Sequence, residues 1–396
     1  MGYINFEEES FVAKNQLQKR KSNNKTLFDS IIRHKNLPKT YNPCKQYSYK
    51  TFTNEHIGRP GTLDEDIFST IENEDIVCAK FIGCKFKNLT FKECRFIGCV
   101  FEDCKFESGG VTFENCTFLK EDTQSKPSLN KYDNLSCQFK NCNIYSKFLN
   151  CILSFSIFEN CKMVTTNFEQ SEMENVIIID CDLDMIVISD CDLSGAKVIA
   201  TYIKDLEFRD KFQTKLDEKS FFDKIPTKFN NKDEYEGIYM TYETLADKFQ
   251  ENNLNNNFGE YYYLCKKTQR KTLSPLPKIW SFLYYITCGY GERPEFAVYS
   301  SLVLIFLFAV IYLFTGVEIN NQTVIYNFTT IKSISLPKIF NDLNETLTLS
   351  VGSFGGVGTI NCKPTQFSYL VNNLEVIIGI IMMGLGIGTL TRKVVR

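Results

Sequence analysis

Cysteine is the residue type whose number in this sequence first suggests chemistry. The chain of 396 residues contains 16 cysteines, which is enough for a disulfide framework or for zinc sites. Zinc ligands usually come in close pairs such as Cys-x2-Cys, often completed by histidine. Here most cysteines fall five residues, or a multiple of five, apart within each run, and the two histidines, His34 and His56, stand alone. We therefore expect free thiols and no metal site.

The remaining reactive side chains form no catalytic pattern. No histidine follows His56, and the sequence shows neither a phosphate-binding loop nor a nucleophile paired with a base. We therefore expect no enzyme activity and no cofactor. The formal net charge of −2 leaves no basic footprint for nucleic acid. Glu375 is the one acid in a long apolar segment. An acid inside a membrane span is a candidate functional residue, and the alternative is a hydrogen bond to a neighbouring segment.

Eleven of the 16 cysteines follow a five-residue repeat between about Ile76 and Ala200. A large apolar residue recurs at every fifth position, and a small residue often stands two positions before it. The large residues include Phe81, Phe86, Phe91, Phe96, Phe101, Phe106, Phe158, Met163, Phe168, Met173, Ile178, Leu183, Ile188, Leu193 and Val198. The small position holds Cys84, Cys94, Cys99, Cys104, Cys116, Cys137, Cys142, Cys151, Cys161, Cys181 and Cys191. A fixed period of this kind is typical of a solenoid.

This pattern resembles the pentapeptide-repeat family over about a third of the chain. The resemblance implies a β-solenoid, a right-handed quadrilateral β-helix with four pentapeptides per coil. In that fold the large apolar residue and the small residue two positions before it both point inward. Roughly 20 recognisable repeats would give about five coils. Since free cysteine behaves as a small buried hydrophobe, we expect a ladder of structural thiols in a reducing compartment.

Composition divides the chain into four parts. Residues 1–72 are polar, and we expect a partly ordered segment with one or two short helices, or a docking or sensing arm. Residues 73–205 hold the repeat, whose acidic stretch from Glu169 to Asp192 is either a solvated face or a surface for a basic protein partner. Residues 206–274 show helical spacing of apolar residues such as Tyr242 and Phe249, which predicts a helical hairpin. Residues 275–396 are the membrane part.

Two uncharged or nearly uncharged segments in the last part are long enough to cross a membrane as helices. They run from Phe296 to Phe314 and from Tyr369 to Thr391. The aromatic segment around Trp280 precedes them and predicts a helix at the membrane interface. Basic residues are enriched on one side of the spans: Lys266, Lys267, Arg270, Lys271, Arg293, Arg392, Lys393 and Arg396. This bias predicts a chain that crosses the membrane twice with both termini in the cytoplasm. A location in the inner (plasma) membrane is what the resemblance to pentapeptide-repeat proteins with two spans implies.

The segment between the spans combines a short apolar helix, a glycine-rich run and a polar exit with Pro364. This order resembles the pore loop and inner helix of potassium-channel-like proteins. Ser350, Ser353 and Phe354 before the run, and Glu375 and Gly379 after it, fit that frame. The resemblance implies two spans with a re-entrant pore loop between them. It also implies an ion filter made of Gly355, Gly356, Val357, Gly358, Thr359 and Ile360.

The filter differs from the family's Thr-Val-Gly-Tyr-Gly-Asp sequence, of which only Val357 and Gly358 are kept. Ile360 replaces a glycine that often needs a positive φ, a costly conformation for a β-branched residue. The resemblance therefore implies a homotetrameric cation channel that conducts K+ or Na+ with weak or no potassium selectivity. Candidate gating and pore residues are Glu375, Gly379, Gly384 and Gly386, where glycines either bend the helix or allow close packing. The alternative is a membrane-anchored repeat scaffold with a vestigial pore loop.

Overall fold

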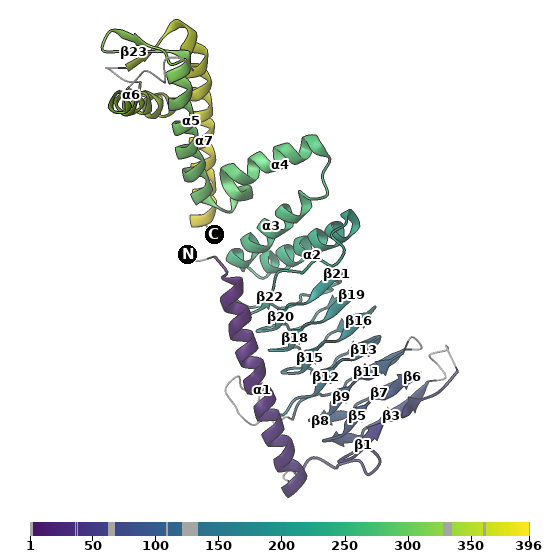
Figure 1. The fold of residues 1–396 in the computed structure, drawn as a ribbon. Helices are drawn as coiled ribbons and strands as arrows, with labels where there is room; N and C mark the ends of the chain where they lie inside the picture. The colour runs from purple at the N-terminus through teal and green to yellow at the C-terminus, as the bar shows by residue number, and fades with distance from the viewer. Residues whose placement is uncertain are drawn as a thin grey trace. The chain divides into compact units, whose positions relative to one another are not determined.

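The computed structural model describes residues 3–35, 37, 39–61, 68–107, 110–120, 134–327, 335–358 and 362–395. The chain splits into two compact units, Met1–Thr272 and Leu273–Arg396. The first unit is a solenoid of short parallel strands with three helices, and the second is mainly helical (Figure 1).

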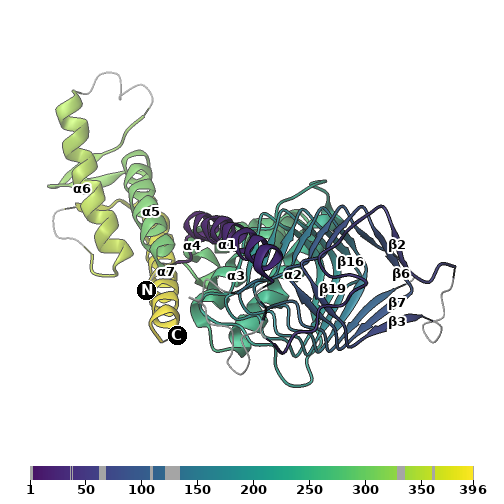
Figure 2. The ribbon, with the colours of Figure 1, turned by 90° about the horizontal axis from the view of Figure 1, so that it is seen from below.

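The solenoid has four faces, each made of parallel strands from successive coils (Figure 2). The first face contains β1 (Thr51–Thr53), β5 (Lys80–Ile82), β9 (Val100–Glu102), β12 (Gln138–Lys140), β15 (Ile157–Glu159), β18 (Ile177–Ile179), β20 (Lys197–Ile199) and β22 (Phe221–Phe222). The second contains β2 (His56–Gly58), β6 (Lys85–Lys87), β10 (Lys105–Phe106), β13 (Asn143–Ile144) and β16 (Lys162–Val164). The third contains β3 (Ser69–Glu72), β7 (Leu89–Lys92), β11 (Val111–Glu114), β14 (Ser146–Leu149) and β17 (Asn167–Glu169).

Two long strands, β19 (Asp182–Ser189) and β21 (Tyr202–Phe208), run across the second and third faces. The fourth face contains β4 (Asp75–Val77) and β8 (Arg95–Ile97), and single bridges continue it to Lys215. Successive coils pair in register, so that Ile157 lies opposite Ile177 and Ile177 opposite Lys197, one coil of 20 residues apart. The described strands make about seven turns. This exceeds the expected five, because the five-residue spacing extends beyond Ile76–Ala200: Phe52 and Ile57, and Ile203 and Phe208, also pair with inward residues of a neighbouring coil.

The interior of the first coils is a set of stacked phenylalanine rings. Phe139, for example, stacks on Phe101 and on Phe158 with 4.7 Å between ring centroids. The Cys161 thiol donates a hydrogen bond to the Phe139 carbonyl oxygen over 3.4 Å. The inward positions predicted for the large apolar residues and the cysteines are therefore those that the solenoid buries.

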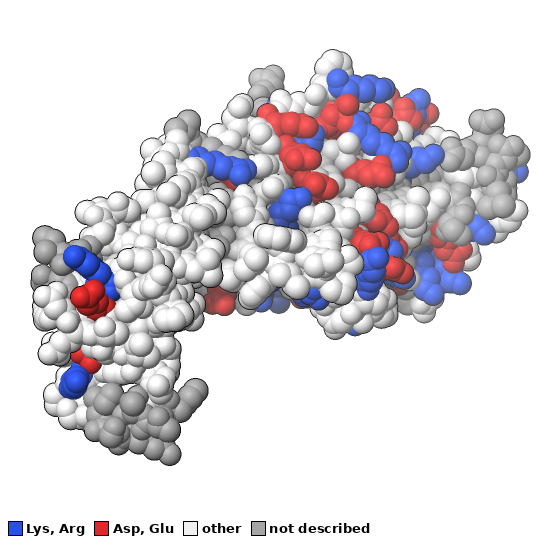
Figure 3. Space-filling model, turned by 90° about the horizontal axis from the view of Figure 1, so that it is seen from above, with Lys and Arg blue, Asp and Glu red and all other residues white. Residues whose placement is uncertain are grey.

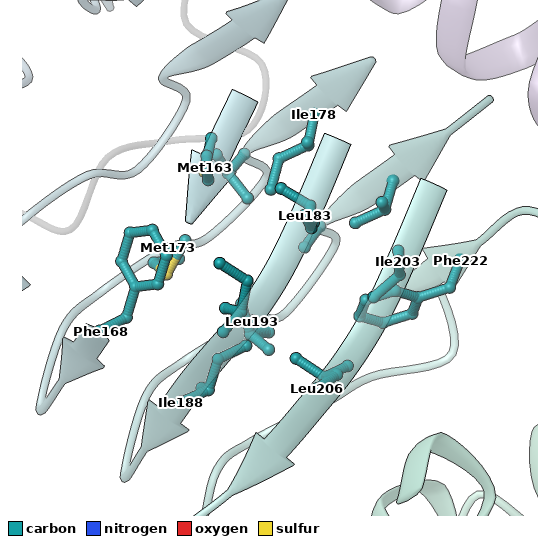
Figure 4. Close-up of a pocket in the computed structure, with 14 residues that line it drawn as sticks. Met163, Phe168, Met173, Ile178, Leu183, Ile188, Leu193, Ile203, Leu206 and Phe222 are labelled. Carbon is teal, nitrogen blue, oxygen red and sulfur yellow. The ribbon is translucent and has the colours of Figure 1, made fainter. Parts of the chain in front are cut away.

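The later coils replace the phenylalanine stack with aliphatic residues (Figure 4). Met163, Met173, Leu183 and Ile203 line a small cavity of about 30 Å³ that has only apolar residues around it. Branched and flexible side chains do not stack flat as rings do, so a gap remains. An apolar cavity of this kind stays free of water.

Helix α1 (Phe6–His34) lies along the solenoid and has 29 residues (Figures 1 and 2). Ala13 and Leu17 form one buried cluster with four isoleucines on the outer side of the solenoid strands. These are Ile157, Ile177, Ile179 and Ile199, and α1 covers them. Glu9 pairs with Lys197 over 2.9 Å, and Asn24 donates to the Ser136 hydroxyl over 3.0 Å. One long helix thus replaces the one or two short helices expected for this segment.

Helices α2 (Lys232–Glu251) and α3 (Asn255–Gln269) occupy the segment for which the sequence predicts a helical hairpin. The Tyr261 hydroxyl accepts a hydrogen bond from the Phe222 amide over 2.9 Å and donates one to the Phe222 carbonyl over 2.8 Å. The ring of Phe249 stacks on Tyr261 at 4.9 Å. The hairpin therefore covers the last coil and satisfies part of its open strand edge.

The second unit begins with α4 (Pro275–Cys288), the 3-10 turn η2 (Gly289–Gly291) and α5 (Pro294–Thr315). It continues with β23 (Val317–Ile319), β24 (Gln322–Val324) and α6 (Leu336–Phe354). It ends with β25 (Cys362–Pro364), η4 (Gln366–Ser368) and α7 (Tyr369–Val395). Helices α5 and α7 are long and apolar enough to cross a membrane, and only 28% and 22% of their apolar windows are buried.

Candidate functional site

The glycine-rich turn follows directly after α6. Of the residues predicted to form the filter, Gly355, Gly356, Val357 and Gly358 are described, and Thr359 and Ile360 lie outside the described residues. Gly356 and Gly358 have φ angles of +71° and +73°. A Cβ at either glycine would meet no atom within 4 Å. These two positions therefore favour glycine for its backbone conformation and not for lack of space.

The N–H groups of the turn bind the end of α6. The Gly356 amide donates to the Ser353 carbonyl over 3.0 Å, and the Val357 and Gly358 amides both donate to the Gly352 carbonyl, over 2.8 and 3.1 Å. Among the described residues, no hydrogen-bond donor reaches the carbonyl oxygens of 355–358. The turn thus uses its N–H groups to cap a helix.

Glu375 lies at the centre of a buried polar network between α5, α6 and α7, with no exposed surface. Its carboxylate accepts a hydrogen bond from the Tyr312 hydroxyl over 2.7 Å and another from the Ser350 hydroxyl of α6. Asn372, one turn earlier in α7, accepts from the Ser353 hydroxyl over 2.6 Å. Glu375 therefore makes the contact that the sequence left as its alternative, a hydrogen bond to the helix before the glycine-rich turn.

The four glycines of α7 differ in their surroundings. A Cβ at Gly379 would lie 2.2 Å from the carbonyl oxygen of Phe354, so α6 and α7 touch there through backbone. A Cβ at Gly386 would lie 3.7 Å from Ala297, and at Gly384 and Gly388 it would meet nothing within 4 Å. Close packing, the alternative to bending, is thus tightest at Gly379, and Gly386 packs near Ala297 with room for a methyl group.

A small sheet holds the chain on the far side of the turn. Strand β25 pairs with β23, which brings Cys362 opposite Ile319 and Pro364 opposite Val317. Beside it, the Tyr326 hydroxyl donates to the Asp342 carboxylate of α6 over 2.6 Å, and burial together with this carboxylate raises the pKa of Tyr326. Both ends of the segment from α6 to α7 are therefore fixed to the chain that leaves α5.

Sequence reasoning missed two members of the polar network, Tyr312 and Asn372. Each is an uncharged polar residue inside an otherwise apolar segment. Asn372 stands three residues before Glu375, and this spacing places both side chains on one face of a helix. That spacing was the available signal. Tyr312, whose hydroxyl donates to the Glu375 carboxylate, is 63 residues away in sequence. No local pattern connects it to Glu375.

The acidic stretch from Glu169 to Asp192 is partly neutralised by basic residues that follow it. Asp182 pairs with Lys228 over 2.7 Å, and Asp192 lies 3.8 Å from Lys215. Figure 3 shows basic and acidic side chains interspersed over the solenoid unit. The surface of the solenoid unit seen in this view thus carries mixed charge.

The comparisons with known proteins bear on the solenoid. Residues 81–121 match the family model for pentapeptide repeats (9 copies). The solenoid is a pentapeptide-repeat domain. The chain is similar to the solved structure of full-length QnrB1, a plasmid-mediated fluoroquinolone resistance protein, with 15% identity over 40% of this chain and 91% of that chain and a TM-score of 0.17.

The pentapeptide-repeat domain has a second solved structure among its similarities. This is HetL, a pentapeptide repeat protein involved in heterocyst differentiation regulation from the cyanobacterium Nostoc sp. strain PCC 7120. The identity is 9%, the match covers 50% of this chain and 95% of that chain, and the TM-score is 0.14. No curated protein matches the sequence.

Proposed function

We propose that four copies of this chain form a cation channel in a membrane, with the glycine-rich turn lining the ion path. The observation that carries this proposal is the arrangement of the turn itself. The N–H groups of residues 356–358 face the end of α6, while the carbonyl oxygens of 355–358 accept no hydrogen bond from the described residues. Rings of backbone carbonyls that replace the hydration shell of a cation are the working principle of potassium-channel filters.

The elements around the turn support a re-entrant pore loop. Helix α6 ends at the turn, so the partial negative charge of its C-terminus favours a cation there. Strand β23, which follows α5, pairs with β25, which precedes α7. The chain therefore leaves and re-enters the helical pair at neighbouring points. One chain with two spans cannot enclose a path, and the uncovered apolar faces of α5 and α7 provide surface for lipid and for neighbouring copies.

In this proposal the permeant ions are K+ and Na+, with weak or no preference between them, because Gly356 replaces the family's threonine. Glu375 acts as a positioning residue, since its contact with Ser350 fixes the end of α6 that carries the turn. Both termini and the pentapeptide-repeat domain lie on the cytoplasmic side of the inner membrane. The cytoplasm is a reducing compartment, in which free thiols persist. The solenoid then remains available for a protein partner.

The test is single-channel recording from the purified full chain in planar bilayers with K+ on one side and Na+ on the other. We expect discrete currents with a reversal potential near zero. Gly358→Ala should abolish or alter the current, because an L-residue at φ +73° is strained. Gly61→Ala is the matched control, since Gly61 has φ +85° and open space but lies in the solenoid unit. Currents that Gly358→Ala leaves unchanged would contradict the proposal.

The second candidate is a membrane-anchored scaffold whose pore loop no longer conducts. The divergence of the filter favours it, since only Val357 and Gly358 match the family sequence. The same recordings decide between the two. An inserted tetramer that stays silent, including in variants that loosen α7, would favour the scaffold.

A further inference from the structure

The C-terminal end of α7 is held by an ion pair to the turn between α4 and α5. Arg392 Nη2 lies 3.1 Å from Glu292 Oε1, and the side chain of Glu292 is only 2% exposed whereas that of Arg392 is 36% exposed. The guanidinium also lies against the backbone of the turn, because a Cβ at Gly291 would be 3.2 Å from Arg392 Nη1. A nearly buried carboxylate is thus matched by a cation that comes from the last turns of α7.

The turn that carries Glu292 is a rigid continuation of α4. The Gly289 amide caps the helix by donating to the Tyr285 carbonyl. The Tyr290 hydroxyl lies 3.0 Å from the Ser281 hydroxyl of α4. The Tyr290 ring packs on those of Tyr284 and Tyr285 with centroid distances of 5.9 and 5.8 Å. A displacement of α4 must therefore move Glu292 with it.

Between its two fixed points, α7 packs on α5 along one side only, through Met382 and Gly386 against Ala297. Glu375 and Gly379 fix the N-terminal half of α7 to α6, and Arg392 fixes the C-terminal end of α7. In between, Gly384 and Gly388 would accommodate a Cβ with no atom within 4 Å. An open groove of about 630 Å³ runs beside this contact, lined by residues of both helices that include Ala297, Leu302, Met382, Met383 and Leu390. Glycines in a helix interior weaken it, so this stretch has both the room and the backbone freedom to bend.

We infer that the Glu292–Arg392 pair is a latch that sets the position of the last third of α7 and transmits movement of α4 to it. Separating the pair would take this cation away from the nearly buried Glu292 carboxylate, which is unfavourable, so the pair favours the closed position of α7. The role of the latch in gating rests on the proposed function. The latch itself is a property of these helices whether or not ions pass.

The test uses the full chain in lipid nanodiscs with a spin label on an introduced cysteine. Val394→Cys reports on the end of α7 and Ile377→Cys on its N-terminal half; these positions are 61% and 54% exposed. The native cysteines are buried and stay unlabelled. Arg392→Gln should raise the ratio of mobile to immobile label at 394 by at least about fivefold, a typical size for a conformational coupling. The ratio at 377 should stay unchanged.

Two further variants make the result specific. Glu292→Gln should loosen position 394 less than Arg392→Gln, because it leaves behind a cation that is partly exposed to water and not a buried carboxylate. Arg392→Lys keeps the charge and should restore most of the immobile component. The latch is overturned if Arg392→Gln leaves position 394 unchanged, or if positions 394 and 377 loosen equally.

Currents recorded from the same samples separate this inference from the proposed function. If Arg392→Gln loosens position 394 and raises the open probability, both stand. If it loosens position 394 while no variant conducts, the latch stands and the channel proposal falls. If wild type and variant conduct alike and position 394 does not change, the channel stands and the latch falls.

Discussion

At the scale of single residues, position decides what the cysteines can do. All 16 are free and buried, and the inward thiols donate to carbonyl oxygens of neighbouring coils, as Cys116 does to Phe91. Burial raises the pKa of Cys116, and it raises the pKa of Cys191 to about 12. The thiolate is the reactive form, so Cys116 and Cys191 are chemically quiet in the folded chain.

Burial of the thiols affects both their labelling and the stability of the fold at high pH. Maleimide at pH 8 should label the folded protein at none of the inward cysteines and should label all of them in denaturant. Stability should fall above about pH 8.5, where the unfolded thiols ionise first, by about 1.4 kcal/mol per pH unit for each raised thiol. For Cys191 this window extends to about pH 12. Denaturant melts between pH 7 and 10 measure the effect; fast labelling of the native protein or pH-independent melts would contradict it.

The inward residues of the repeat could be predicted from sequence because their spacing is local and regular. The contacts of Glu375 could be predicted only in part. Its partner Ser350 belongs to the same recognisable frame, whereas Tyr312 lies in the preceding span, 63 residues away. The conformation of the glycine turn follows from its glycines, but the capping role of its amides depends on where α6 ends.

At the scale of elements, α1 is the feature that sequence reasoning described least well. Only five of its residues are buried, namely Phe6, Ala13, Leu17, Asn24 and Ile31, so its apolar stripe is too sparse to stand out in a polar segment. The stronger signal was on the solenoid. Outward positions of coils one period apart carry isoleucine, as in Ile157 with Ile177 and Ile179 with Ile199. Aliphatic residues at outward positions need a cover.

Leu17→Asp should release α1 from the solenoid, because it puts a charge into the cluster around Ile157 and Ile177. We expect trypsin to cut at Lys19–Lys21 at least about tenfold faster, since local opening controls cleavage. Gln18→Asp is the control, because residue 18 is exposed in the same helix. Limited proteolysis followed by mass spectrometry measures both rates. Equal rates for the two variants would show that the cluster does not hold α1.

At the scale of the whole molecule, the chain divides after Thr272 into units with their own contacts. Sequence predicted the repeat and the two apolar segments, since both depend on local periodicity or composition. It did not predict the number of coils. Strands β1 and β21 keep the five-residue spacing, with Phe52 opposite Phe81 and Ile203 opposite Leu183, but lack the cysteine two positions before the large residue that marks the central repeats.

Residues 1–272 expressed alone should therefore fold and remain soluble. The unit keeps α1 on one face and the α2–α3 hairpin over its last coil, and every residue of its main hydrophobic cluster lies within the fragment. Circular dichroism should show a cooperative melt within a few degrees of that of the full chain, and gel filtration should show no aggregate. Precipitation, or a melt without cooperativity, would show that the second unit supports the first.

The contacts of α1 with several coils also restrict how many coils the solenoid can have. A helix of 29 residues is about 43 Å long, and each coil adds about 4.8 Å to the stack. A duplicated 20-residue coil between Ile157 and Ile177 would fit inside the solenoid, because the register between coils repeats. Outside, it would carry Lys197 away from Glu9 by a full coil while the contacts of Asn24 stayed in place. The helix thereby selects one coil number out of many that the interior alone would accept.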